Sequence, residues 1–456
     1  MEKVTQLDTF RVISERVGRF NVKGKRFLIP EMNPFGSHLL AAIFQSFGVN
    51  ASVMDTYEGL DLGKKFTSGK ECFPCIVTLG DILYFMEKER DRLGDKFHPE
   101  NYMYFMPEAS GPCRFGMYNK LHRIILDSIP DLDKVNIATL SSDDAYDLKG
   151  LIPKEKIQAF RKAGYLSIVV GDIIVVGDIL DRLLWRVRPY EKAEGMADTF
   201  ILDARNKMSE SFTIHSSNGN FSAILSDLKK IVKEARNIID LTMSRKPLIG
   251  VVGEIYVRTH VKSNQDAIRT LEKYGAEVVN ASVGEWINYT TYDQIRLAKI
   301  ALRLNLKKFQ LKEVKKSLLQ YLKYNLTLFY QYMQQRKMYQ IVRKYIDIEE
   351  DHKIGHLEKV LKKTNTFSFA IGTEACLSIS SALELARRGY NGVVNIFPFT
   401  CMPSNLTASI TKPLMGKLNV PYIDVSYDGS FQPGREAALR TFMYQAYQHF
   451  KTHGKP

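Results

Sequence analysis

The chain has 456 residues, 45% of them hydrophobic and 25% charged, which is enough apolar material for two or three ordinary domain cores. Its net charge of +14 suits nucleic acid, an acidic partner, a phosphorylated small molecule or an anionic cofactor. The N-terminus lacks a signal-peptide core, and the longest apolar run, 166–180, is broken by Asp172 and Asp178. We therefore expect neither export nor membrane insertion. A cytoplasmic location is expected instead.

The first third of the chain alternates between strand-like and helix-like patterns. Short apolar runs predict strands at 26–30, 51–54, 102–106 and 135–140. Leu39, Leu40, Ile43 and Phe44 have helical spacing, and Gly48 ends that helix before the second strand. This order of strand, helix and strand is typical of a parallel sheet.

The same order returns in the last third, with strands predicted at 248–253, 277–281, 368–371, 393–397 and 422–425. The region between the two thirds is helix-rich, although 166–176 is a strand-like apolar run. We therefore predict an α/β fold with two parallel-sheet domains and an additional helical region. The expected boundaries are 1–150, a bridging region 151–246, and 247–456 with a helical insertion at 291–365.

Part of that insertion, 291–345, is strongly basic and contains no glycine or proline. It has thirteen Lys and Arg against Asp293 and Glu313, with Tyr and Phe interleaved. Without a nucleic-acid-binding motif, charge alone is a weak signal for such binding. We interpret the stretch as an amphipathic insertion with solvated lysines and aromatic residues in the core, and an acidic redox partner would use the same lysines.

All five cysteines lie in short motifs beside predicted strand ends or helix starts. The motifs are ECFPC at 71–75, GPCR at 111–114, TEAC at 373–376 and FTCMP at 399–403. Pro74 and Pro403 are placed to open helices, and a helix start favours a thiolate or an anionic cluster. An odd number of cysteines without an export signal makes disulfides a poor explanation.

The pattern indicates a metal centre held by thiolates, and an iron–sulfur cluster fits best. The Cys72–Cys75 spacing alone is ambiguous between zinc, a redox dithiol and iron–sulfur. Zinc usually needs two closely spaced pairs, whereas a [4Fe–4S] cluster accepts dispersed ligands. Cys113, Cys376 and Cys401 are each expected at the carboxyl end of a strand, where open α/β sheets bind ligands. For Cys376, a buried inert thiol is an equal alternative.

Four segments together resemble the 2-hydroxyacyl-CoA dehydratase superfamily, from about Arg26 to the C-terminus. They are TSGKECFPC at 67–75, ASGPCRFG at 109–116, GEIYVR at 253–258 and FPFTCMP at 397–403. The likeness is closest to the dehydratase-like module of CoA-activase-type proteins, a branch that also resembles the double-cubane cluster proteins. It implies two Rossmann-like domains with iron–sulfur clusters between them.

The resemblance implies Cys72, Cys75, Cys113 and Cys401 as cluster ligands, with Cys376 as a fifth. Either one [4Fe–4S] cluster or a double cubane [8Fe–9S] is implied, although two three-thiolate cubanes need six cysteines and the chain has five. Electrons would come from a separate ATP-hydrolysing activator with its own cluster, because this chain has no phosphate-binding loop of its own. Anaerobic reduction or dehydration of a small molecule or acyl-CoA, by a homodimer, is implied. A non-catalytic electron-transfer or scaffold subunit is the alternative.

Candidate catalytic residues lie within or beside the motifs: Glu71, Ser110, Arg114 and Glu374, with Glu254 nearby in the GEIYVR segment. A carboxylate near a cluster can move a proton during reduction or elimination. Capping of helices as first-turn acids is the favoured alternative for Glu71 and Glu374. We interpret His122 and His260 as structural.

Overall fold

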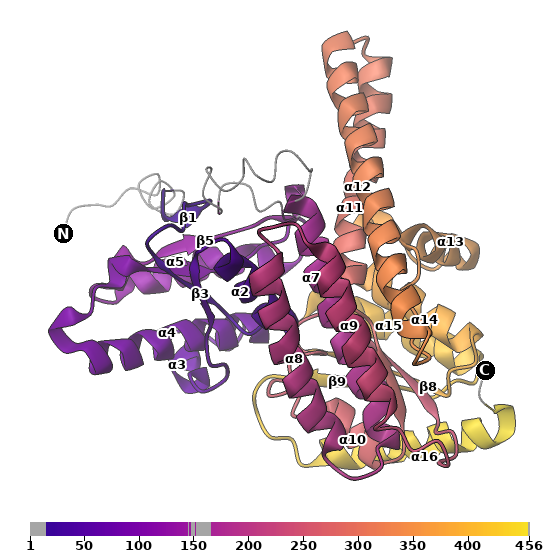
Figure 1. The fold of residues 1–456 in the computed structure, drawn as a ribbon. Helices are drawn as coiled ribbons and strands as arrows, with labels where there is room; N and C mark the ends of the chain where they lie inside the picture. The colour runs from indigo at the N-terminus through magenta and orange to yellow at the C-terminus, as the bar shows by residue number, and fades with distance from the viewer. Residues whose placement is uncertain (1–14, 145, 147–150, 152–165, 455–456) are drawn as a thin grey trace.

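The structure is a computed structural model that describes residues 15–144, 146, 151 and 166–454. These residues form an α/β fold with two separate sheets, both entirely parallel. The first sheet lies in the N-terminal part and the second in the C-terminal part, and long helices fill the space between them (Figure 1). The predicted fold class is thus confirmed as α/β with two parallel sheets.

The first sheet has five strands in the order β1 (Val17–Gly18), β5 (Asn136–Ala138), β4 (Tyr102–Phe105), β2 (Arg26–Ile29) and β3 (Asn50–Val53). Its side chains alternate between two cores, as a pleated strand requires. Phe27 and Ile29 pack with α2 (Gly36–Ser46), while Leu28 faces α4 (Phe73–Leu93) and α5 (Tyr118–Ser128). Helices therefore cover both faces, and the short α3 (Leu60–Lys65) packs against α4.

The second sheet has four strands in the order β7 (Glu277–Asn280), β6 (Leu248–Gly253), β8 (Gly392–Pro398) and β9 (Tyr422–Tyr427). Its two faces also carry helices. Ile249 and Val251 pack with α10 (Ala267–Lys273) and α16 (Gly434–His453). Leu248 and Val252 face α13 (Ile354–Thr364), α14 (Ala375–Arg387) and the end of α15 (Met402–Lys417).

Three helices connect the sheets: α7 (Leu166–Val187), α8 (Met196–His215) and α9 (Phe221–Arg236). The strand-like run at 166–176 is therefore the start of a helix. From Ile173 onward this helix is buried on several sides, since α7 contacts α2, α8, β7 and both helices of the insertion. The strand predicted at 368–371 is also wrong. Ser368 accepts a hydrogen bond from the backbone N–H of Ala370 (3.1 Å), and the segment forms a short 3₁₀ turn.

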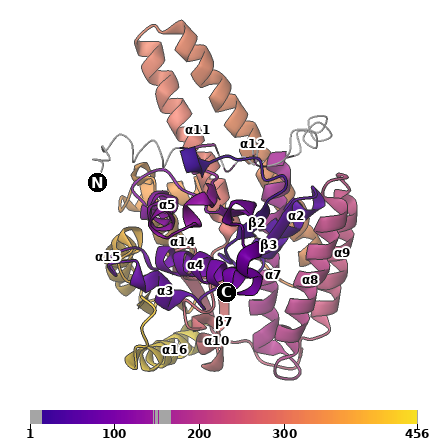
Figure 2. The same ribbon diagram turned by 90° about the vertical axis from the view of Figure 1, so that its left-hand side faces the viewer.

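The basic insertion forms a long helical hairpin of α11 (Val283–Lys307) and α12 (Leu311–Arg343). The hairpin projects from the body in both views (Figures 1 and 2). Ile295, Tyr324 and Leu328 are packed between the two helices, so the expectation of aromatic core residues holds for that tyrosine. It fails for Phe309 and Phe329, which are exposed. Among the described residues, no helix is long and apolar enough to cross a bilayer.

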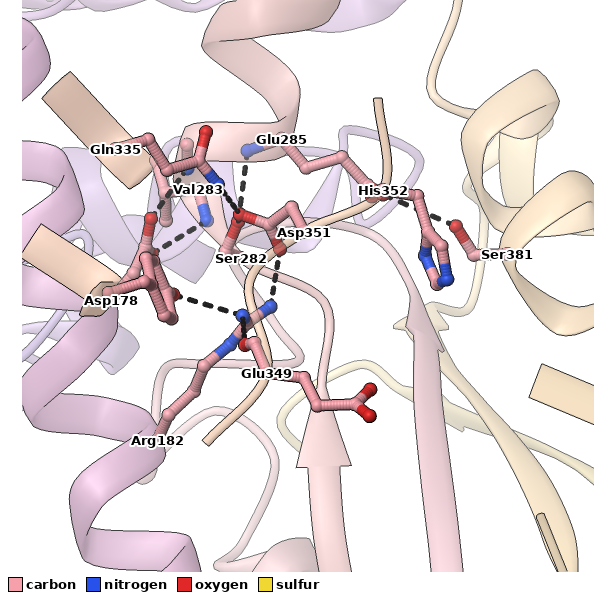
Figure 3. A network of polar contacts seen from close by, with 12 residues as sticks. Asp178, Arg182, Ser282, Val283, Glu285, Gln335, Glu349, Asp351, His352 and Ser381 are labelled. Carbon is pink, nitrogen blue, oxygen red and sulfur yellow. Dashed lines mark hydrogen bonds and ion pairs between the residues drawn. The ribbon is translucent and has the colours of Figure 1, made fainter. Parts of the chain in front are cut away.

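A buried polar network joins α7 to the insertion (Figure 3). Asp178 accepts hydrogen bonds from the backbone N–H groups of Val283 and Gly284, both 2.8 Å, at the start of α11. Arg182 pairs with Asp351 and donates to the carbonyl oxygen of Glu349 (2.6 Å). Ser282 (2.6 Å) and Gln335 (2.9 Å) donate to that same Asp351 carboxylate. The network fixes the base of the hairpin against the bridging helices.

Glu89 on α4 predicts an acid-dependent loss of stability. Hydrogen bonds from Arg92 chiefly lower the pKa of Glu89, with help from Tyr102 and Arg26, to about 2. A depressed carboxyl pKa stabilises the fold above its ordinary value of 4.5, and this contribution disappears as pH falls toward 2. We expect Glu89→Gln to cost roughly 1–3 kcal/mol at pH 7 and progressively less between pH 4.5 and 2. Urea titrations of both proteins across this range would show it, and a pH-independent difference would contradict it.

Candidate functional site

The carboxyl edges of both sheets face one cavity of about 230 Å³. Ile29 and Phe105, which end β2 and β4, line it from the first sheet. Glu254, directly after β6, and Cys401, three residues after β8, line it from the second. Carboxyl ends of parallel strands are where open α/β folds bind ligands, so this cavity is the candidate site.

Three of the five cysteines, Cys72, Cys113 and Cys401, lie on the wall of this cavity. Each occupies the N-cap position of a helical segment, namely α4, the 3₁₀ turn Arg114–Met117 and α15. All three have extended backbones (ψ between 112° and 133°), and none uses its side chain as a cap. The prolines predicted to open two of the helices stand at the second helical residue rather than the first.

Arg114 connects the three cysteine loops. Its guanidinium donates to the carbonyl oxygen of Lys70 (2.7 Å), two residues before Cys72. It also donates to the hydroxyl (2.8 Å) and carbonyl oxygens of Thr400, the residue before Cys401. Because Arg114 itself follows Cys113, one side chain holds all three loops in register. These hydrogen bonds give Arg114 a structural role, and the catalytic role expected from the sequence stays a prediction.

Glycines allow the motif loops to approach one another closely. Gly111 has φ +100°, and a Cβ on it would lie 3.0 Å from the carbonyl oxygen of Gly372, which begins the turn before Glu374. Gly253 has φ +118°, and its Cβ would collide with the carbonyl oxygen of Ile396 on β8. The backbone of the GPCR segment thus lies against the turn before Glu374, and that of the GEIYVR segment lies against β8.

Gly253 therefore yields a second prediction. Gly253→Ala adds both a left-handed backbone penalty and a clash with β8, so we expect a loss of roughly 3–5 kcal/mol in unfolding free energy. Gly275→Ala is the matched control, because Gly275 also has a positive φ (+90°) but nothing within 4 Å of its Cβ; about 1–2 kcal/mol is expected there. Chemical denaturation would measure both, and equal losses would contradict the argument.

Two buried carboxyl groups, Glu254 and Glu374, complete the polar part of the wall. Burial and then the nearby Glu374 raise the pKa of Glu254 to about 7. Burial likewise raises the pKa of Glu374. Glu254 accepts hydrogen bonds from the backbone N–H groups of Tyr256 (3.0 Å) and Val257 (2.8 Å). A carboxyl with a pKa near neutrality can both hold and release a proton.

Burial raises the pKa of all three cavity thiols, and that of Cys72 to about 12. The carboxylates of Glu254 and Glu374 raise these pKa values further. In the metal-free chain, desolvation and negative neighbours therefore outweigh the helix ends, so the thiols stay protonated rather than ionised. That these helix starts favour an anionic cluster stays a prediction. A cation bound by these sulfurs would displace their protons.

The other two cysteines are not among the described lining residues. Cys75 lies close enough to Cys72 for the two thiols to interact electrostatically, but its sulfur faces His122 Nε2 at 3.5 Å. The Cys376 thiol donates to the carbonyl oxygen of Thr373 (2.9 Å) within the core beneath α14. Because 368–371 is not a strand, Cys376 does not follow a strand end as expected. The structure brings together three of the predicted ligands.

The remaining predicted residues lie around the site. Glu71 accepts from the backbone N–H of Ser68 (2.9 Å) and precedes the N-cap of α4, so it is no first-turn acid. Glu374 is itself the N-cap of α14, with no side-chain capping bond. The exposed Ser110 contacts Ser142. His122 and His260 are buried away from the described wall, and burial lowers the pKa of each to about 4.

Sequence reasoning missed the aromatic part of the wall. Tyr118 lies beside Cys72, and its hydrogen bond partly offsets the rise in the pKa of that thiol. Tyr146 receives a hydrogen bond from the indole N–H of Trp286 (3.3 Å), and both line the cavity. Tyr118 follows Cys113 by five residues and opens α5, a spacing that carries no recognisable signal on its own. Most of the remaining wall is apolar and includes Met32, Leu40, Leu140, Ile173, Ile174 and Ile287.

Among the described residues, no three His, Cys, Asp or Glu side chains converge tightly enough to hold a single metal ion. No protein-family model matches the chain, and no curated protein matches it.

Proposed function

We propose that the chain is a cytoplasmic iron–sulfur protein of the 2-hydroxyacyl-CoA dehydratase type, with two Rossmann-like domains. Cys72, Cys113 and Cys401 would hold a [4Fe–4S] cluster, and the observation that carries this is their convergence on one cavity between the sheets. The donor set fits, since thiolates are the usual ligands of such clusters. Three thiols suit one cubane with an iron left for substrate better than they suit a double cubane.

The cluster would supply one electron at low potential to a small molecule or acyl-CoA, leading to reduction or to loss of water. A separate ATP-hydrolysing activator with its own cluster would provide that electron. The residues of this chain would position and protonate the substrate. Glu254 and Glu374 can hold a proton at the cavity wall, while the apolar wall excludes water. Arg114 keeps the three cysteine loops together.

A non-catalytic electron carrier is the second candidate. A carrier needs a closed site with every iron ligated, whereas here a cavity with two buried carboxyl groups lies beside three thiols. That arrangement favours an enzyme, because a pure carrier has no need of a proton donor near its cluster. Zinc binding or dithiol redox chemistry is the third candidate and is separated by metal analysis.

The test is iron, sulfide and zinc content per chain after strictly anaerobic purification, with EPR spectra of the reduced protein. About four irons and about four sulfides per chain are expected for one cubane. About eight irons per chain would indicate a double cubane instead of a single one. Zinc without iron or sulfide, in protein never exposed to air, would overturn the proposal.

A further inference from the structure

Helix α12 of the hairpin has an apolar stripe that the packing of the hairpin leaves exposed, and α11 has a shorter one at Leu297 (51%), Ile300 (49%) and Leu304 (52%). Its inner side is occupied, since Tyr324 and Leu328 of α12 pack against Ile295 of α11. The stripe on α12 consists of five residues that are each about half exposed or more: Leu319 (58%), Leu322 (55%), Leu326 (70%), Phe329 (65%) and Met333 (47%). It lies in the part of the chain that projects from the body (Figures 1 and 2).

The spacing within the stripe is that of a coiled-coil seam. Successive members are separated by three, four, three and four residues, which is the a/d repeat of a heptad. Over fourteen helical rises the stripe extends about 21 Å. A seam with this spacing fits a single partner helix.

Lysines border the stripe in the same register. With Leu319, Leu326 and Met333 at a positions, three of the four e positions hold Lys316, Lys323 and Lys337, and the fourth holds Tyr330. All three lysines are exposed, and none forms an ion pair with any described residue. From 295 to 330 the chain has nine Lys and Arg against Glu313 alone. Charges at e and g positions select the partner of a coiled coil.

We propose that this stripe binds a helix of another protein whose apolar seam is flanked by Asp and Glu. Acidic residues beside that seam would meet Lys316, Lys323 and Lys337, while its apolar residues cover Leu326 and Phe329. A second copy of this chain is disfavoured, because pairing two such stripes brings like charges together. The inference does not depend on the iron–sulfur proposal.

Two labelled synthetic helices of four heptads test this on the full-length chain, both with Leu at a and d. One carries Glu at every e and g position, and the other carries Lys. Fluorescence anisotropy should show the Glu peptide binding at least tenfold more tightly than the Lys peptide, with affinity falling as salt rises. Leu326→Glu with Phe329→Glu should weaken binding at least tenfold. Leu241→Glu, an exposed apolar position (79%) outside the hairpin, is the control and should change it less than twofold.

Charge reversal distinguishes specific pairing from nonspecific hydrophobic binding. Lys316→Glu, Lys323→Glu and Lys337→Glu together should reverse the preference toward the Lys peptide. Equal binding of both peptides, or binding unaffected by the stripe substitutions, would overturn the proposal. So would sedimentation showing dimers that Leu326→Glu with Phe329→Glu dissociates, since a second copy would then cover the stripe. Stripe-dependent binding to phosphatidylserine vesicles, with no peptide binding, would assign it to a membrane instead.

Discussion

Arg182→Met is expected to lower the free energy of unfolding by about 3–5 kcal/mol. The guanidinium pairs with Asp351, and both side chains are buried, at 9% and 4% exposure. Removing the cation leaves the Asp351 carboxylate beside Asp178 and Glu285, where burial and Asp351 already raise both pKa values. Because the same network holds α11 against α7, the loss of stability should appear as a lower urea midpoint for the whole molecule.

Arg388→Met is the matched control, because Arg388 pairs with Glu349 at a site where both side chains are a third or more exposed. A pair of that kind contributes about 0–1 kcal/mol. The double variant Arg182→Met with Asp351→Asn should recover part of the loss, since the orphaned charge is gone. Equal destabilisation by the two arginine variants would contradict the view that burial makes the Arg182 pair important.

Strands were predictable where the chain is buried on both faces and turns bracket it. The segment 248–253 is an example: every residue of β6 is buried, and the predicted bounds are those observed. The run at 166–176 shows the limit, because a continuous apolar stretch has no period that separates a buried strand from a buried helix. At 368–371 the backbone N–H of Ala370 donates to the side chain of Ser368 in a 3₁₀ turn, and the short apolar pattern of the sequence does not reveal this turn.

The site was predictable to the extent that parallel strands place their carboxyl ends at one edge. Cys113 and Cys401 follow β4 and β8, so each was expected at such an edge. That two edges from different sheets face one cavity depends on how α7, α8 and α9 hold the sheets, which no local pattern records. That Cys75 joins Cys72 as a ligand stays a prediction. In the structure Cys72 has an extended backbone (φ −65°, ψ 133°), and the sulfur of Cys75 faces His122.

For the proposed cluster, separate replacement of the cavity cysteines should have the largest effect on the iron content. Cys113→Ala and Cys401→Ala each remove a sulfur from the cavity wall, and we expect roughly tenfold or greater loss of iron retention on anaerobic gel filtration. Cys75→Ala and Cys376→Ala are matched controls, because these sulfurs face His122 and the carbonyl oxygen of Thr373 instead. They should keep their iron and the EPR signal of the reduced protein.

The controls also separate a ligand from a packing residue. Cys376 is fully buried in the core under α14, so Cys376→Ala should lower the unfolding free energy by about 1 kcal/mol while the iron content stays constant. Cys113 is only partly buried, so its replacement should change the stability of the metal-free chain little and the iron content greatly. Metal ligation by the cavity thiols therefore requires that Cys376→Ala lowers stability without loss of iron, whereas Cys113→Ala loses iron with little change in stability. Iron lost from Cys75→Ala and Cys376→Ala as readily as from Cys113→Ala would place the cluster away from this cavity.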